Sequence, residues 1–433
     1  MNIRLYNARI LTMEEDVDIF FGEIWIKNGQ IIYVARQEEI NEEYNIDFPV
    51  PKWDREIDCN GNLLMPGFKN AHTHSAMTLM RSLADDLPLQ EWLETKIFPT
   101  EAKLRDDDIY YFTKLAIVEY LSSGITGIFD MYLIPDAVAK ACCELGMRCV
   151  IVSGLNNFTS SIEQTEREYL KWNQKDSLIS YKLGCHAEYT CNKPLLEELS
   201  KLAHKYKAPV FAHMSETEKE VQECMERYGM TPPVFFDSLG LFDFGGGIFH
   251  GVHVDEEDYG VFKRSNLSIV TNPASNGKLA SGIAPIKQYL QKGIPVAIGT
   301  DGASSNNSLD MFKEMFLVSA FSNIKEKSAS SISAKDIIRM ATVNGSRIMG
   351  LDDCDVLASG KNADIIMIDL QQPNMQPIHN IENNIVYSGS KINVKMTMIN
   401  GKILYENGNY YVGEDVQQIY DNCKAVVKRV IEL

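Results

Sequence analysis

The first sixty residues alternate short apolar segments with polar turns. Apolar runs of this length between turn residues are typical of β-strands. The chain is therefore expected to begin with strands at Ile3–Leu5, Ile10–Thr12, Ile24–Lys27 and Ile31–Val34.

The last eighty residues begin with a similar pattern. Strands are expected at Asp364–Asp369, Val394–Ile399 and Lys402–Tyr405. The dipeptide Asn400-Gly401 between the last two is a strong signal for a hairpin turn. Two strand-rich ends around a different middle predict one small β-sandwich domain made from residues 1–62 and 352–433. The stretch from Val416 to Leu433 is expected to close it as a helix.

The middle of the chain, residues 63–351, alternates strand and helix patterns. Helices are expected at Asp107–Ser122, Pro194–Lys205 and Ile286–Lys292, among others. Strand candidates end near Asn70–His74, Ile128–Met131, Val150–Gly154, Leu183–His186, Val210–His213, Ile248–Val252, Ile269–Asn272 and Val296–Asp301. Eight strands with intervening helices over this length predict an α/β fold of the (β/α)₈ TIM-barrel type. An open doubly wound sheet is the alternative, but no Gly-rich phosphate loop follows any of the strands.

Composition narrows the range of partners. A chain of 433 residues with 45% hydrophobic residues buries a substantial core, and its net charge is −17. Such a charge argues against nucleic acid or an anionic membrane as the main partner and is compatible with a small polar substrate. No apolar run is long enough for a transmembrane helix, and the strand-like start lacks the plan of a signal peptide. A cytoplasmic protein is expected, and assembly into a homo-oligomer stays open.

The nine cysteines are scattered without a CxxC motif. Their odd number in a long chain favours reduced thiols over a disulfide framework.

Most of the histidines fall at the ends of predicted strands, where a barrel carries its catalytic groups. His72 and His74 stand two residues apart at a strand end, so both imidazoles lie on one face and are able to share a metal. A lone HxH pair is usually two ordinary histidines. Here five of the eight histidines fall at predicted strand ends, and Asp301 closes the eighth strand. These five are His72, His74, His186, His213 and His250, whereas His204, His253 and His379 are interpreted as ordinary helix, loop or surface residues.

Glu216 follows His213 by three residues, at what is expected to be a capped helix start at Thr217. Alone it would be an acid favoured by the helix dipole. Beside a strand-end histidine it is a candidate to move protons of a metal-activated water, because a bound Zn²⁺ lowers the pKa of water from about 15.7 toward 7. Three histidines, one aspartate and a water would form a catalytic shell. Zn²⁺ is expected, with Fe²⁺ as the alternative, since imidazole and carboxylate suit both.

Seven segments form a connected set of motifs: Pro66–His74, Met77–Arg81, Ala84–Leu93, His186–Thr190, Phe211–Glu216, Asn272–Asn276 and Thr300–Asn307. With them nearly the whole chain resembles the amidohydrolase superfamily. More narrowly, it is similar to the 5′-methylthioadenosine/S-adenosylhomocysteine deaminases, which convert an adenine nucleoside to the hypoxanthine nucleoside and ammonia.

The resemblance implies a metal site. His72, His74, His213 and Asp301 would hold one divalent metal. Superfamily members with two metals carry a carboxylated lysine at the end of the fourth strand. Here Lys182 comes too early in that strand, so one metal is expected.

The resemblance also implies roles around the substrate, a purine nucleoside. His250 would orient the attacking water, and Glu216 would contact a purine ring nitrogen and relay the proton. His186 would contact the substrate, and Glu101 would hydrogen-bond the ribose hydroxyls. Asp301 would take part in catalysis as well as in metal binding.

Two departures from the family pattern concern the substrate. Glu188 stands where the family commonly has proline, which would bring a charge to the mouth of the site or to its rim. Ser153 stands where members that bind the homocysteine carboxylate have an arginine. Neutral groups on the ribose 5′ carbon are therefore expected to be preferred over the homocysteine tail.

Other activities of the same fold are the main alternatives. A chlorohydrolase of the aminotriazine type, or a deaminase of a free base such as guanine, would use the same metal chemistry. Glu101 argues against both, because a ribose contact serves neither substrate. A non-catalytic scaffold is disfavoured because all expected ligands and Glu216 are present.

Overall fold

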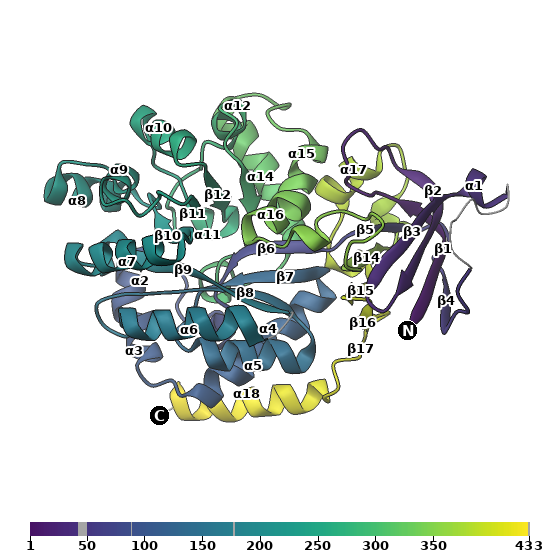
Figure 1. The fold of residues 1–433 in the computed structure, drawn as a ribbon, viewed down its shortest axis with the longest axis horizontal. Coiled ribbons are helices and arrows are strands. Elements are labelled where there is room, and N and C mark those ends of the chain that lie inside the picture. Colours follow the sequence, from purple (N-terminus) through teal and green to yellow (C-terminus); the bar gives the residue numbers. More distant parts are fainter. Residues whose placement is uncertain (42–49, 88, 176–177, 432–433) are drawn as a thin grey trace.

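The computed structural model describes residues 1–41, 50–87, 89–175 and 178–431. Pro88 of the segment Ala84–Leu93, and the last two residues of the expected closing helix, lie outside the described residues. Figure 1 shows a barrel with its helices beside a smaller sheet domain, to which the N-terminus belongs.

The barrel consists of eight parallel strands in chain order. They are β6 (Phe68–Thr73), β7 (Ile125–Asp130), β8 (Arg148–Val152), β9 (Ile179–Ala187), β10 (Val210–Met214), β11 (Gly246–His250), β12 (Leu267–Thr271) and β13 (Val296–Ile298). Beyond the last strand, the Asp301 N–H donates to the His72 carbonyl over 3.0 Å and so brings the first and eighth strand ends together. The predicted (β/α)₈ barrel is confirmed.

Helices cover the outside of the barrel (Figure 1). The longer ones are α4 (Asp106–Ser122), α5 (Pro135–Leu145), α6 (Ile162–Lys175), α7 (Lys193–Tyr206), α8 (Glu218–Tyr228), α10 (Glu256–Arg264) and α14 (Met311–Glu326). Shorter helical segments include η1 (Ser75–Met80), α2 (Leu89–Trp92), α3 (Phe98–Glu101), α9 (Pro232–Ser238), α11 (Pro273–Lys278), α12 (Ile286–Gln291), α13 (Ala303–Asn306), α15 (Ala334–Arg339) and α16 (Gly345–Met349). The start of α8 agrees with the sequence expectation, because the Thr217 hydroxyl accepts a hydrogen bond from the Glu220 N–H and caps the helix.

Apolar side chains fill the barrel interior. They form a separate buried cluster that includes Ala71, Phe129, Val150, Val152, Phe211, Phe249, Val270 and Ala297. A filled interior of this kind leaves chemistry to the carboxyl ends of the strands.

The small domain is one connected sheet that draws strands from both ends of the chain. Its order is β17-β16-β15-β14-β5-β1-β2-β3, with β4 beside β1. The strands are β1 (Asn2–Ile10), β2 (Phe20–Lys27), β3 (Gln30–Arg36), β4 (Arg55–Asp58), β5 (Leu63–Pro66), β14 (Ile365–Ile368), β15 (Val394–Ile399), β16 (Lys402–Glu406) and β17 (Asn409–Tyr410).

Two details of this domain were not evident from the sequence. The two strands expected at Ile3–Leu5 and Ile10–Thr12 are one strand, β1, with an irregularity between Leu5 and Ala8. The strand β5, which begins at the boundary expected at residue 63, pairs with β14 in the small sheet. A four-residue apolar strand directly before a barrel strand carries no signal of its own sheet in the sequence.

The C-terminal helix α18 (Val416–Val430) lies on the barrel, whereas the sequence assigned it to the small domain. Its buried residues Ile419, Cys423, Val426 and Val430 form a stripe at helical spacing. The Cys423 thiol donates to the Tyr111 carbonyl on α4 over 3.5 Å, and Figure 1 shows the helix running along this side of the barrel. The stripe predicts the helix but not the surface that it covers.

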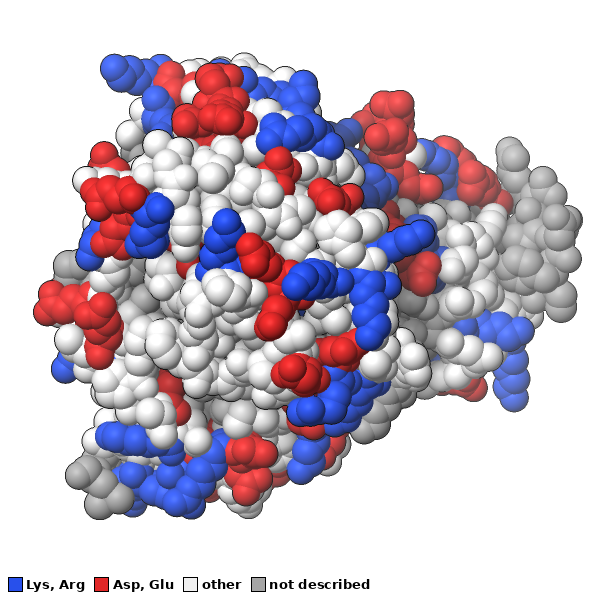
Figure 2. Space-filling view, turned by 60° about the vertical axis from the view of Figure 1, so that its left-hand side comes forward, with Lys and Arg blue, Asp and Glu red and all other residues white. Residues whose placement is uncertain are grey.

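Three further properties concern the surface charge, the cysteines and the lengths of the apolar helices. On the face shown in Figure 2, acidic and basic side chains are interspersed. All nine cysteines are free thiols. Among the described residues, no helix combines the length and the apolar character that a membrane span requires.

Candidate metal centre and active site

The four predicted metal ligands stand at the carboxyl ends of three barrel strands. His72 is the penultimate residue of β6 and His74 follows that strand, while His213 lies on β10 and Asp301 lies beyond β13. The backbone of Asp301 is left-handed, with φ of 58°. This conformation is uncommon for a residue other than glycine and is found more often at functional sites than elsewhere.

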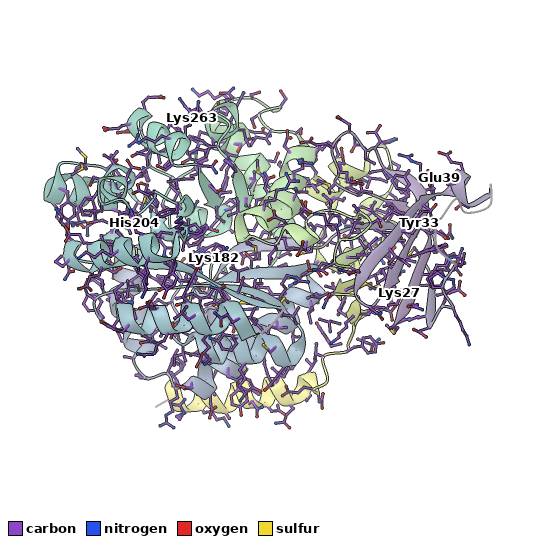
Figure 3. All side chains as sticks on the ribbon, viewed as in Figure 1. Lys27, Tyr33, Glu39, Lys182, His204 and Lys263 are labelled. Atoms are coloured by element: carbon purple, nitrogen blue, oxygen red, sulfur yellow. The ribbon has the colours of Figure 1, made fainter. Side chains whose placement is uncertain are left out.

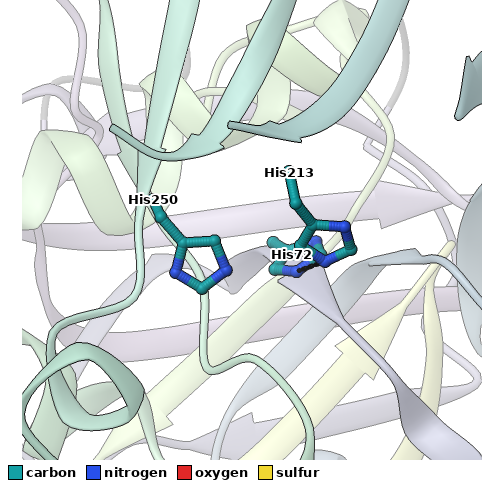
Figure 4. Close-up of side chains that lie close together, drawn as sticks. All are labelled: His72, His213 and His250. Atoms are coloured by element: carbon teal, nitrogen blue, oxygen red, sulfur yellow. Dashed lines mark hydrogen bonds between the residues drawn. The ribbon is translucent and has the colours of Figure 1, made fainter. Parts of the chain in front are cut away.

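The side chains of these residues converge on one point. The Nε2 atom of His213 lies 3.1 Å from His72 Nε2 and 3.2 Å from His74 Nε2, and Figure 4 shows the close approach of His72 and His213. The Asp301 Oδ1 atom lies 3.2 Å from His74 Nε2. Zn–N bonds of about 2.0–2.1 Å in a tetrahedron separate ligand nitrogens by about 3.3 Å. The spacing therefore fits ligands of one shared cation.

Hydrogen bonds fix the other side of two imidazole rings. His74 Nδ1 donates to the Met131 carbonyl, and His213 Nδ1 donates to the His186 carbonyl over 2.7 Å. Each ring thereby directs its Nε2 atom to the common point, which is the arrangement of metal-binding histidines. His72 is instead stacked on Phe249, with ring centroids 3.9 Å apart.

The Asp301 carboxylate is held by three donors. The Ser275 and Ser305 hydroxyls donate to Oδ2 over 2.6 and 2.9 Å, and the Gly302 N–H donates to Oδ1 over 2.7 Å. Burial opposes its charge, but His74 outweighs burial and holds the pKa of Asp301 well below its ordinary value. The group is thus an ionised, preoriented oxygen ligand.

Burial also keeps two of the imidazoles neutral. It lowers the pKa values of His72 and His213 well below the ordinary value, and neighbouring histidines add to the effect. For His74, burial is outweighed by the Asp301 carboxylate, which raises its pKa to about 9. Two neutral imidazoles, a third from which a bound cation would displace the proton, and one buried carboxylate form a donor set that suits a divalent cation such as Zn²⁺ or Fe²⁺.

His250 and Glu216 face each other beside this cluster. His250 ends β11 with φ of 76°, and its Nε2 atom lies 3.7 Å from Glu216 Oε2. His250 Nδ1 donates to Asn276 Oδ1 over 2.8 Å, which leaves Nε2 as an acceptor. The Ser281 hydroxyl donates to Glu216 Oε1 over 3.3 Å. Burial raises the pKa of Glu216 above its ordinary value, so the carboxylate takes up a proton more readily than an exposed one.

A second set of three histidines also satisfies the distance requirement for a metal. The nitrogen atoms of His72, His213 and His250 lie within 4.8 Å of one another, as do the ligand atoms of His72, His74 and Asp301. Geometry alone therefore leaves His250 near enough to be a ligand. The Glu216 contact of His250 distinguishes it from the other histidines.

The site lies at the bottom of one cavity of about 460 Å³, a size typical of small-molecule sites. The predicted substrate residues Glu101, Ser153 and His186 line it together with Glu216. His186 is half-buried near the end of β9, with Nδ1 3.0 Å from the Thr190 hydroxyl, and burial lowers its pKa to about 4. Burial raises the pKa of Glu101 to about 7.

Glu188 does not line the cavity, in contrast to the expectation of a charge at the mouth. It is 2% exposed and forms a two-pronged ion pair with Arg227 of α8, with Oε2 2.5 Å from Nη2. The charge is therefore used to hold α8 against the segment that follows β9.

Three other polar residues that the sequence analysis considered lie away from the predicted metal ligands. Lys182 lies within β9 and is absent from the cavity wall (Figure 3). His204 lies on the outer helix α7, where it pairs with Asp243 over 2.9 Å. His253 approaches the Ser281 carbonyl over 2.7 Å.

The sequence did not assign roles to several residues that hold the site in place. Ser275, Asn276 and Ser305 contact Asp301 or His250 directly. Ser275 and Asn276 fall in the motif Asn272–Asn276 and Ser305 in Thr300–Asn307, so the motifs themselves were the available signal. Glu220 is another such residue: its carboxylate accepts the backbone N–H groups of Ser215 and Glu216 over 2.9 and 2.8 Å.

Comparison with known proteins decides the family. A model of the amidohydrolase family matches residues 63–404. The chain belongs to the amidohydrolase family. The predicted resemblance is confirmed, and the four residues predicted as metal ligands lie within the matched region.

Several relatives of this amidohydrolase share one name. It is 43% identical to a 5-methylthioadenosine/S-adenosylhomocysteine deaminase of Syntrophomonas wolfei, over 88% of this chain and 90% of that protein. It is 36% identical to a protein of the same name from Thermoanaerobacter pseudethanolicus, over the full length of both. Among solved structures it is similar to an adenosine deaminase from Xanthomonas campestris with bound zinc, with a TM-score of 0.93 and 29% identity, covering 100% of this chain and 99% of that one.

Proposed function

We propose that this amidohydrolase is a metal-dependent deaminase of adenine nucleosides. It would convert 5′-methylthioadenosine, adenosine or a related 5′-substituted nucleoside to the hypoxanthine nucleoside and ammonia. The observation that carries the proposal is the full-length similarity to proteins named as such deaminases, together with a cavity that joins Glu216 to Glu101.

We assign the metal to His72, His74, His213 and Asp301, with one Zn²⁺ per chain. The converging Nε2 atoms and the buried carboxylate support this set. The zinc in the similar adenosine deaminase structure supports the choice of metal. When bound there, the cation would lower the pKa of a water molecule toward 7 and supply a nucleophile at neutral pH.

The protein groups would then direct the proton transfers. The water oxygen forms a bond to C6 of the purine, the C6–N bond breaks, and the amino group leaves as ammonia. Glu216 would move one proton of the water to the ring nitrogen and the second, from the hydroxyl then attached to C6, to the leaving amine, so that C6 keeps the oxygen as a carbonyl. His250, with Nε2 available as an acceptor, would hold the water in line. His186 would contact the substrate from β9.

Glu101 is the group that favours a nucleoside over a free base or a triazine. It lies in the same cavity as the cluster of histidines and Asp301 but on α3, away from the strands that carry the proposed ligands. A carboxylate accepts two hydroxyl donors at once, which matches the vicinal hydroxyls of ribose. We therefore assign Glu101 to the ribose.

The test is an ultraviolet absorbance screen, because conversion of adenine to hypoxanthine changes the spectrum. Purified enzyme loaded with Zn²⁺ is expected to turn over adenosine and 5′-methylthioadenosine with kcat/KM at least about 100-fold above that for free adenine, guanine or a chlorotriazine. In Glu101→Gln the advantage of the nucleosides should shrink by about ten- to a hundredfold through KM and kcat together. Preference for a free base or for the triazine would contradict the assignment.

A further inference from the structure

The cavity extends beyond the barrel mouth to a second polar end. Val150 and Val152 of β8 face the barrel interior, whereas Ser153 lies against the helical layer, 3.3 Å from the Thr165 hydroxyl on α6. The far wall is made by the segment after β8, by one face of α6 and by Tyr181 of β9. We call this end the α6 pocket; its polar lining comprises Ser153, Asn156, Ser160, Gln164, Thr165, Glu168 and Tyr181.

Glu168 is the charged group of the α6 pocket. Gln164 and Glu168 are four residues apart on one face of α6, and Gln164 Nε2 donates to Glu168 Oε1 over 2.9 Å. The Tyr181 hydroxyl donates to Oε2 over 2.9 Å. Burial and the charge of Glu168 raise the pKa of Tyr181 well above its ordinary value, so its hydroxyl stays a neutral donor. The carboxylate is thus oriented by two neutral groups.

No cation balances this charge in the described part of the chain. No Lys or Arg of the described residues lines the cavity, and Glu168 forms no ion pair among them. Two basic side chains near α6 are paired with other acids: Lys171 pairs with Asp136, and Lys205 pairs with Glu166. A carboxylate offers about four acceptor positions, of which two are occupied, so a ligand is able to use the rest.

We propose that the α6 pocket binds the group attached to the ribose 5′ carbon and that Glu168 selects a positively charged, amine-bearing group there. The inference rests on the proposed function. The purine is placed at the metal centre and the ribose at Glu101, so the substituent continues along the cavity toward α6. A partly desolvated carboxylate attracts an ammonium group and repels a carboxylate or phosphate. Nucleoside thioethers that end in an amine are therefore the substrate class, and 5′-nucleotides are excluded.

This reasoning replaces the expectation that neutral groups on the ribose 5′ carbon are preferred, which rested on Ser153. The sequence suggested a pocket of neutral hydrogen bonds that merely fails to bind a carboxylate. Glu168 makes the pocket anionic, so a carboxylate tail is opposed as well as unsupported. The homocysteine tail carries both charges, and its amine alone would gain from Glu168.

The experiment compares three adenine nucleosides whose 5′-thioether chains have equal length and end in an ammonium, a methyl or a carboxylate group. The wild-type enzyme with Zn²⁺ is expected to show kcat/KM for the ammonium compound ten- to a hundredfold above that for the carboxylate compound, with the methyl compound between them. In Glu168→Gln this ratio should fall by about tenfold or more. Ser153→Arg, which places a cation beside Glu168, should lower the same ratio.

The matched control is Glu163→Gln. Glu163 is an exposed acid on the same helix that does not line the cavity, so this variant changes the net charge equally and should leave the ratio unchanged. Turnover of adenosine by the wild type tests the proposed function separately. If adenosine is deaminated but the carboxylate compound is preferred, or if Glu168→Gln and Glu163→Gln have equal ratios, the inference about Glu168 is wrong. The wild-type ratio decides the matter if Glu168→Gln does not fold.

Discussion

Glu216→Gln is expected to lower kcat by 10²–10⁴-fold while the protein keeps its fold and its metal. General acid–base groups contribute this much, and Glu216 serves more than one proton transfer in the proposed reaction. Glutamine occupies nearly the same volume and keeps an oxygen toward the Ser281 hydroxyl, so the contact with Ser281 is preserved. Steady-state kinetics with adenosine, together with elemental analysis of the variant, provide the measurement.

Glu220→Gln is the matched comparison. Glu220 is equally buried and lies on the same segment, but its carboxylate accepts two backbone N–H groups and it does not line the cavity. Its loss should act through the position of Glu216, with a smaller effect on kcat and a lower unfolding temperature. A loss below about tenfold in Glu216→Gln would show that another residue performs the proton relay.

His213→Asn and His250→Asn are expected to separate metal binding from catalysis. His213 faces two other Nε2 atoms at 3.1 and 3.2 Å, so its replacement should remove the metal and, with it, more than about 99% of the activity. His250→Asn should retain about one metal per chain while turnover falls by 10²-fold or more, because its Nε2 faces Glu216. Metal-to-protein ratios after identical purification are the readout.

His204→Asn controls for the handling of histidine variants. His204 lies on α7 and pairs with Asp243 outside the cavity, so both metal content and activity should match the wild type. Loss of metal from both His213→Asn and His250→Asn would support the alternative ligand set of His72, His213 and His250. Metal lost from His250→Asn but kept by His213→Asn would contradict both ligand sets.

The sequence predicted the barrel well because its signals are local. Each barrel strand is a short apolar run, and a histidine or aspartate at its end marks the face where chemistry gathers. The positions of His72, His74, His213 and Asp301 follow from the fold once the strands are placed in order. Their roles stay a proposal, since only the convergence of the side chains is given by the structure.

Features that depend on distant contacts were harder to predict. The strand β5 looks like the start of the barrel, because nothing in Leu63–Pro66 indicates its partner β14 three hundred residues later. The apolar stripe of α18 predicts a buried helix face but not the surface against which that face packs. The partner of Glu188 is likewise invisible until α8 is in place, when Arg227 meets it.

The acidic end of the cavity shows the same limit. Ser153 could be identified from the sequence because an arginine was expected at that position. Glu168 could not, because the polar face of its helix resembles that of any helix exposed to solvent. Only the packing of α6 against the end of β8 brings Glu168 and Ser153 into one cavity.

The most direct measurement is the turnover of adenosine by enzyme depleted of metal with a chelator and then reloaded with one equivalent of Zn²⁺. The metal-free protein is expected to be folded and inactive. The reloaded protein should release ammonia and the hypoxanthine nucleoside in equal amounts. Ammonia release unaffected by metal removal, a need for two equivalents, or formation of free adenine by the folded, metal-loaded enzyme would contradict the account.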